Sequence, residues 1–331
     1  MLHHGGNLKS AALAFPQAPQ PWIDLSTGIN PVPYPFAPPS AAAWTRLPEA
    51  CAIAGLEAAA ARRYGAADAA GVVAAPGTQA LIQWLPQLWR AKTVGILGFT
   101  YSEHGRLWRA AEAEIVTVER AEQMAHFDVA IVVNPNNPDG RLVSVAALHG
   151  LAREMTRHGG LLVVDEAFAD VLPVSASLVP DLPGNALVLR SFGKAYGLAG
   201  LRLGFAVASF ALAEKLRATL GPWAVSGAAV EIGTAALADG GWLATSVARL
   251  AEDGARLDRC LAAAGFREVR GTPLFRLANH PEAEHWFERL GQAGILVRPF
   301  ADHRNWLRFG LPGVGEWQRV GAALSPGSEA C

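Results

Sequence analysis

The chain has 331 residues, 51% of them hydrophobic, and a formal net charge of −1. This apolar content suits a buried core and excludes a disordered chain, and the near-neutral charge leaves no basic patch for nucleic acid or acidic lipid. The length allows one large domain or two smaller ones. We therefore expect a folded protein that binds neither nucleic acid nor a membrane.

The amino terminus and the cysteines indicate the cytoplasm. The opening MLHHGGNLKS lacks the apolar segment of a signal peptide, and no charge-free apolar run reaches the roughly 20 residues that cross a bilayer. Cys51, Cys260 and Cys331 are far apart and odd in number, so they suggest neither a disulfide framework nor a metal site. We expect a cytoplasmic protein without a bound metal.

The predicted elements alternate between strands and helices. The first 40 residues are rich in Pro and Gly, with one strand-like piece at Trp22–Leu25, and resemble an extended arm. Residues 48–64 and 78–89 have helical patterns. Short runs rich in Val, Ile and Leu predict strands at Val72–Ala75, Thr93–Leu97, Asp128–Val133, Leu161–Asp165, Ala186–Arg190 and Leu203–Ala208. Such strands, separated by helices, are typical of a buried parallel sheet in an α/β domain.

The pattern changes at about residue 226. A long Ala-rich helix follows, and then shorter mixed segments that end at Arg308. We expect a large α/β domain over residues 35–225. The arm, residues 1–34, and a smaller α+β domain, residues 226–331, make up the rest.

Polar residues follow three of the predicted strands, where ligands of α/β sheets bind. Residues 77–79 open a helix whose backbone N–H groups favour an anion, although an ordinary helix cap has the same pattern. Residues 134–140, NPNNPDG, form a rigid turn whose amides either bind a ligand or only shape a loop. Asp165 ends a buried strand and needs a cationic partner, either a protonated ring nitrogen or a salt bridge.

The most specific motif is SFGKAYGLAGLRLG, residues 191–204. It places Ser191 three residues before Lys194 and Arg202 eight residues after it. Lysine is scarce in this chain, which has only Lys9, Lys92, Lys194 and Lys215. A buried lysine near other cations has a lowered pKa and reacts readily with a carbonyl. Ser191 and Arg202 suit a phosphate on the same ligand.

The motifs NPNNPDG, DEAF and SFGKAYGLAGLRLGF, in this order, resemble the class I/II aminotransferase family, the fold-type I enzymes that use pyridoxal 5′-phosphate (PLP). The resemblance implies a large domain with a mostly parallel central sheet and a smaller α+β domain. It implies that Lys194 binds PLP covalently, that Asp165 contacts the pyridine nitrogen and that Asn137 contacts the ring hydroxyl. The residues implied for the remaining contacts are Gly77, Thr78, Gln79, Ser191 and Arg202 for the phosphate, Tyr101 for ring stacking and Arg308 for the substrate carboxylate.

A narrower resemblance covers nearly the whole chain. His4-Gly5-Gly6-Asn7, residues 24–31 and Pro222–Ser226 are similar to the threonine-phosphate decarboxylases of cobalamin biosynthesis, which are related to histidinol-phosphate aminotransferases. It implies a homodimer that decarboxylates a small phosphorylated amino acid, with His4 and Arg298 as candidates for binding the substrate phosphate. An aminotransferase and a PLP-binding scaffold without turnover remain as alternatives.

Two positions depart from the pattern of the aminotransferases. Phe168 stands where these enzymes usually have a Tyr that contacts the ring oxygen of PLP. Arg46 lies in the segment where a Tyr from the neighbouring subunit commonly contacts the phosphate. Phe168 favours decarboxylation, since the decarboxylases also have Phe at this position. The second leaves open whether Arg46 replaces the missing hydroxyl.

Overall fold

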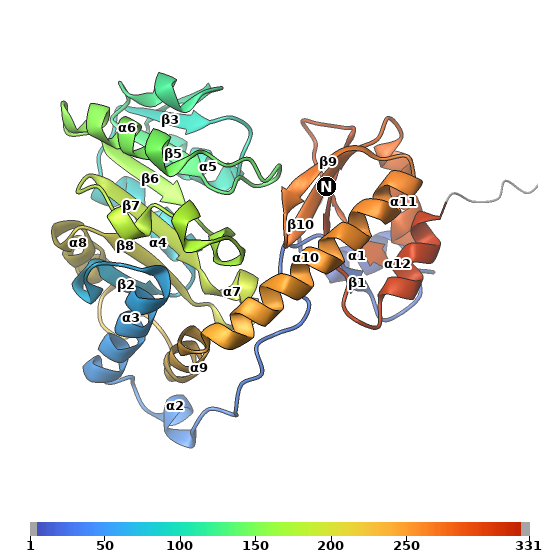
Figure 1. The fold of residues 1–331 in the computed structure, drawn as a ribbon, viewed down its shortest axis with the longest axis horizontal. Coiled ribbons are helices and arrows are strands. Elements are labelled where there is room, and N and C mark those ends of the chain that lie inside the picture. The colour runs from blue at the N-terminus through green and yellow to red at the C-terminus, as the bar shows by residue number, and fades with distance from the viewer. Residues whose placement is uncertain (1–4, 326–331) are drawn as a thin grey trace, which may run out of the picture. The chain divides into compact units, whose positions relative to one another are not determined.

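The computed structural model describes residues 5–325, which divide into two compact units (Figure 1). The larger unit consists of residues 34–137 and 141–243, and the smaller unit of residues 5–33, 138–140 and 244–325. His4 lies outside the described residues. No helix within residues 5–325 has the length and apolar character needed to span a membrane.

The larger unit contains a seven-stranded sheet. Its strands, in spatial order, are β2 (Val72–Ala75), β8 (Gly204–Ala208), β7 (Ala186–Ser191), β6 (Leu161–Asp165), β5 (Val129–Val133), β3 (Thr93–Leu97) and β4 (Glu114–Val118). β8 runs antiparallel to both β2 and β7, and all other neighbours pair in parallel. The expectation of a mostly parallel sheet is thus confirmed, and β8 is the exception to it. Residues 192–203, which lead into β8, contain only single helical turns and lack the crossover helix that a parallel neighbour requires.

Helices bury both faces of this sheet, as expected for parallel strands. On one face, Ile131 and Val163 join a core cluster with Leu81 of α4 (Thr78–Leu88) and Trp108 of α5 (Ser102–Ala110). The intervening strand residues, such as Val132, are also fully buried, which completes the second face. Figure 1 shows the helices of this unit, which are α2 (Ala41–Thr45), α3 (Ala50–Tyr64), α4 (Thr78–Leu88), α5 (Ser102–Ala110), α6 (Val145–Thr156), α7 (Phe192–Ala195), α8 (Phe210–Leu220) and α9 (Gly227–Ala238).

Two elements differ from the expectations. β4 is an edge strand that the sequence pattern does not indicate, because its side chains are exposed or only half-buried. The single long helix expected from residue 226 is two helices, α9 and α10 (Gly240–Ala263). Asp239 separates them, and its carboxylate caps the second helix by accepting a hydrogen bond from the Trp242 amide at 2.9 Å.

The smaller unit has two short sheets. β1 (Ile23–Asp24), from the amino-terminal arm, pairs in parallel with β11 (Ile295–Leu296). An antiparallel sheet has the order β12 (Arg298–Pro299), β13 (Trp306–Gly310), β10 (Phe275–Asn279) and β9 (Arg267–Thr272). The helices of this unit are α1 (Leu8–Ala14), most of α10, α11 (Ala283–Gln292) and α12 (Trp317–Leu324).

A buried ion cluster stabilises the carboxyl ends of β6 and β7. Arg190 forms ion pairs with Glu166, at 2.7 Å, and with Asp170. Glu166 also accepts hydrogen bonds from the Ser177 hydroxyl, at 2.5 Å, and from the Leu178 amide, at 2.8 Å. Burial alone would lower the pKa of Arg190, but the two carboxylates raise it above its usual value. The guanidinium therefore stays charged while the protein is folded.

We expect Arg190→Met to lower the free energy of unfolding by about 3–5 kcal/mol, because it leaves two carboxylates buried without their cation. Denaturant unfolding followed by tryptophan fluorescence measures this change. Arg157→Met is the control, since Arg157 pairs with Glu154 on the exposed surface and its loss should cost at most about 1 kcal/mol. Equal effects of the two substitutions would contradict the structural role of the cluster.

Candidate active site

Three neighbouring strands bring the predicted phosphate-binding residues to one point. Ala75 at the end of β2 pairs with Gly204, and Gly204 pairs with Ser191 at the end of β7. Because β8 runs in the opposite direction, its amino end lies beside the carboxyl ends of β2 and β7. The turn that follows β2, the segment that precedes β8 and Ser191 therefore meet at the same edge of the sheet.

This meeting point has the character of an anion site, which we call the phosphate cup (Gly77, Thr78, Gln79, Ser191 and Arg202). Gly77 has a φ of 80°, and a Cβ at this position would lie 2.8 Å from a terminal guanidinium nitrogen of Arg202. The guanidinium thus lies against the start of α4, where the amides of Thr78 and Gln79 have no acceptor within the helix. Within residues 5–325, no carboxylate pairs with Arg202 and no group hydrogen-bonds the Ser191 hydroxyl.

Asp165 ends β6 at the same edge of the sheet and is 3% exposed. One of its oxygens lies 2.9 Å from Nε2 of His104, which is fully buried, and the other accepts a hydrogen bond from the Ala167 amide at 3.1 Å. The partner of Asp165 is His104, whereas the next residue, Glu166, forms a buried ion pair with Arg190. Asp165 therefore keeps a carboxylate at the sheet edge, oriented by a histidine.

Lys194 lies in α7, directly after β7. Its Nζ is 5.7 Å from the centre of the Phe168 ring, which is buried. Lys194 is half-buried beside this ring. A neutral amine is the form that reacts with a carbonyl.

The loop after β5 carries three asparagines, and two of them hold the loop in place through their side-chain amides. Asn134 exchanges hydrogen bonds with the backbone of Val143, at 3.1 and 2.8 Å. Asn136 donates to the Phe99 carbonyl at 3.0 Å and accepts from the Thr100 hydroxyl at 2.6 Å. Both side chains hold the loop in place. Asn137, which follows them, stays the predicted ligand of the cofactor ring.

Tyr101 caps the start of α5 and is half-buried. Its hydroxyl donates a hydrogen bond to Oε1 of Gln79 at 3.0 Å, and its ring meets that of His104 edge to face, with centroids 6.1 Å apart. His104 and the side chain of Gln79 are residues that the sequence motifs do not indicate. The i, i+3 spacing between Tyr101 and His104 is the signal that could have suggested a shared helix face.

The smaller unit contains the predicted substrate arginines. Arg308 on β13 pairs in register with Arg298 on β12, and Arg308 donates a hydrogen bond to the Ser26 carbonyl at 2.6 Å. Burial and the positive charge of Arg298 lower the pKa of Arg308 to about 10, although Asp24 opposes the shift. Two buried or half-buried cations side by side favour the binding of an anion.

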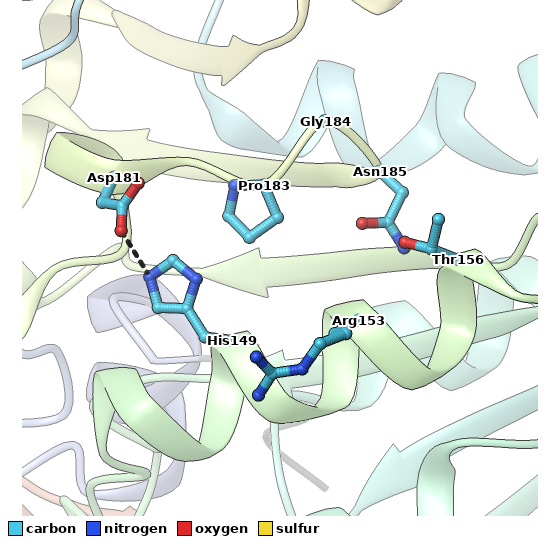
Figure 2. A pocket seen from close by; sticks show the side chains of 7 residues that line it. All are labelled: His149, Arg153, Thr156, Asp181, Pro183, Gly184 and Asn185. Carbon is cyan, nitrogen blue, oxygen red and sulfur yellow. Dashed lines mark ion pairs between the residues drawn. The ribbon is translucent and has the colours of Figure 1, made fainter.

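A surface pocket lies at the other end of the sheet strands (Figure 2). Figure 2 shows His149, Arg153 and Thr156 of α6 facing the loop before β7, where His149 pairs with Asp181 at 3.5 Å. Asn185, at the amino end of β7, also lines this pocket. Since Lys194 follows the carboxyl end of β7, the pocket is separate from the candidate site.

The residues at the carboxyl edge of the sheet fit PLP. The phosphate cup suits its phosphate, the buried Asp165 carboxylate suits a protonated pyridine nitrogen, and the Lys194 amine suits its aldehyde. The cup brings backbone amides, the Ser191 hydroxyl and the Arg202 guanidinium together from three separate segments, and all of these groups can donate hydrogen bonds to a phosphate.

The protein-family model for aminotransferase class I and II matches residues 40–318. A threonine-phosphate decarboxylase from Sinorhizobium sp. is 42% identical over 97% of both chains, and another from Pseudomonas aeruginosa is 40% identical over 98% of this chain and 97% of the relative. A crystal structure of histidinol-phosphate aminotransferase from Sinorhizobium meliloti in complex with pyridoxal-5′-phosphate has the same fold, with a TM-score of 0.80 and 20% identity over 96% of this chain and 94% of that chain. This chain therefore belongs to the aminotransferase class I and II family of PLP-dependent enzymes.

Proposed function

We propose that this protein is a PLP-dependent carboxy-lyase that converts L-threonine O-3-phosphate to (R)-1-aminopropan-2-ol O-2-phosphate in cobalamin biosynthesis. The observation that carries this proposal is the similarity, over 97% of both chains at 42% identity, to a protein named threonine-phosphate decarboxylase. A histidinol-phosphate aminotransferase from Thermobifida fusca, which represents the alternative activity, is 29% identical over 88% of this chain. The reaction breaks the bond from Cα to the carboxylate carbon, releases carbon dioxide and adds a proton at Cα.

PLP, when bound, accepts the electron pair that the broken bond leaves on Cα. The negative charge of Asp165 would hold a proton on the pyridine nitrogen, which would make the ring a stronger electron acceptor. His104 orients the Asp165 carboxylate from 2.9 Å. Lys194 would hold the cofactor through its amine, and the same amine would donate the proton that Cα needs.

We propose that the substrate anions bind the arginines of the smaller unit. Arg308 would bind the carboxylate, and Arg298 together with His4 would bind the substrate phosphate. The two anchored ends would together determine which bond to Cα is placed for cleavage. Binding of the remote phosphate would select this bond by fixing the rotation about Cα.

Phe168 supports decarboxylation over transamination. Its buried ring lies next to Lys194 and has no hydroxyl to offer the ring oxygen of PLP. Asn137 is then the side chain proposed to contact that oxygen. A histidinol-phosphate aminotransferase remains the alternative function.

We also propose that the enzyme is a homodimer, as the family resemblance implies, and that it acts in the cytoplasm. Trp44 and Leu47 support an interface near Arg46, because these large apolar side chains are 69% and 63% exposed in the larger unit. The proposed partner is a second copy of the chain.

We expect the purified enzyme to release carbon dioxide from O-phosphothreonine without any added 2-oxo acid. The product should be aminopropanol phosphate. Threonine should react poorly because it lacks the phosphate that fixes the rotation about its Cα. A parallel reaction contains histidinol phosphate and 2-oxoglutarate. Glutamate in the second reaction, with no carbon dioxide in the first, would favour the aminotransferase.

We expect borohydride to fix a pyridoxyl group on Lys194, because this is the lysine next to the phosphate cup. Peptide mapping by mass spectrometry locates the label. Lys215 is the internal control, since it lies on α8 over the ring of Trp89. A label on Lys215 or Lys92, with Lys194 unmodified, would refute the assignment.

We expect Asp165→Asn to lower kcat by about 10²–10³-fold, a magnitude typical of removing one electrostatic contact to developing charge. The substitution keeps the shape of the side chain but removes the charge that retains a proton on the ring nitrogen. Steady-state kinetics measures the loss, and thermal unfolding shows whether the fold is intact. Normal turnover in a folded variant would limit Asp165 to a structural role.

A further inference from the structure

A chain of hydrogen bonds links Tyr101 to a salt bridge on the first turn of α5. The Tyr101 hydroxyl donates to Oε1 of Gln79 at 3.0 Å, and Nε2 of Gln79 donates to Glu103 at 3.1 Å. Glu103 in turn accepts two hydrogen bonds from Arg106, at 2.9 and 2.6 Å. These hydrogen bonds therefore join the start of α4 to the start of α5.

The charge of Glu103 fixes the direction of every hydrogen bond in this chain. A carboxylate only accepts, so the Gln79 amide must turn its NH₂ group toward Glu103. Its oxygen then faces Tyr101, and the phenol must donate. The Arg106 guanidinium reinforces this state, because its two bonds to Glu103 are charge-assisted, and this contact raises the pKa of Arg106.

Glu103 and Arg106 differ in their exposure to solvent. Glu103 is 8% exposed, whereas the side chain of Arg106 is 60% exposed. A buried carboxylate is costly unless its oxygens are well satisfied, and here Arg106 and Gln79 satisfy them. Glu103 therefore has a stable position from which it can hold Gln79.

We propose that Glu103 is a positioning residue for PLP, and this inference rests on the proposed role of Tyr101 in stacking on the cofactor ring. Gln79 belongs to the phosphate cup through its backbone and holds Tyr101 through its side chain. Glu103, by fixing the Gln79 side chain, thus sets the ring-stacking residue relative to the phosphate site. The ring and the phosphate of the cofactor are positioned by one connected network.

The test is Glu103→Gln, which keeps the size of the side chain but removes the charge that sets the hydrogen-bond direction. We expect the dissociation constant of PLP, measured by equilibrium dialysis of the full chain, to rise about three- to tenfold, as for one lost hydrogen bond. We also expect a weaker visible circular dichroism per bound PLP, because a less constrained ring gives a smaller signal. Thermal unfolding reports whether the variant is folded.

Two further variants make the test specific. Tyr101→Phe removes the hydroxyl at the end of the chain, and we expect it to change the dichroism in the same direction. The double variant should show no more than the larger single effect, since both residues act through one network. Glu154→Gln is the matched control, because it removes another i, i+3 pair with arginine, on the surface of α6, and should bind PLP as the unmodified protein does.

The outcomes separate the inference from the proposed function. Unchanged affinity and dichroism in a folded Glu103→Gln protein, or additive effects in the double variant, would overturn the role of Glu103 but leave the PLP site intact. Should Glu103→Gln fail to fold, Tyr101→Phe decides, and an unchanged dichroism in that variant overturns the inference. An unmodified protein that binds no PLP would refute the proposed function and the inference together.

Discussion

The antiparallel insertion of β8 between β2 and β7 is the constraint on which the candidate site depends. It places Gly204 between Ala75 and Ser191, so the amino end of β8 lies between the carboxyl ends of β2 and β7. A fully parallel sheet would put the start of β8 at the opposite edge and carry Arg202 away from the first turn of α4. The single reversed strand thus combines a helix amino terminus, a hydroxyl and a guanidinium in one anion site.

The end of β6 separates two adjacent carboxylates. Asp165 is the last residue of β6 and Glu166 directly follows the strand, yet the two side chains have different partners. Glu166 joins Arg190 and stabilises the fold, whereas Asp165 faces His104 and stays at the edge where the cofactor is proposed to bind. Glu166 thus stabilises the fold, and Asp165, one residue earlier, is the residue proposed to act on the cofactor.

Much of the fold follows from the sequence, because buried strands are rich in Val, Ile and Leu. β4 is missed because a half-exposed edge strand lacks this pattern, and the break at Asp239 is missed because Ala-rich sequence continues across it. The motifs indicate the PLP family and the lysine, but His104 lies 61 residues from Asp165 and no local spacing reveals the contact. The roles of Arg298 and Arg308 in substrate binding stay predictions, since the same arginines suit several anions.

The position of β2 also has a consequence for how the protein matures. β2 is an edge strand whose one neighbour in the sheet is β8, so residues 72–75 cannot join the sheet before residues 204–208 have been synthesised. Pairing across so long a separation in sequence is entropically costly and comes late in folding. A nascent chain that has already exposed Lys194 would therefore still lack the cup that retains a phosphate. With the cup assigned as proposed, stable capture of PLP would wait until β2 has joined the sheet, which would make it a late event in the life of the new polypeptide.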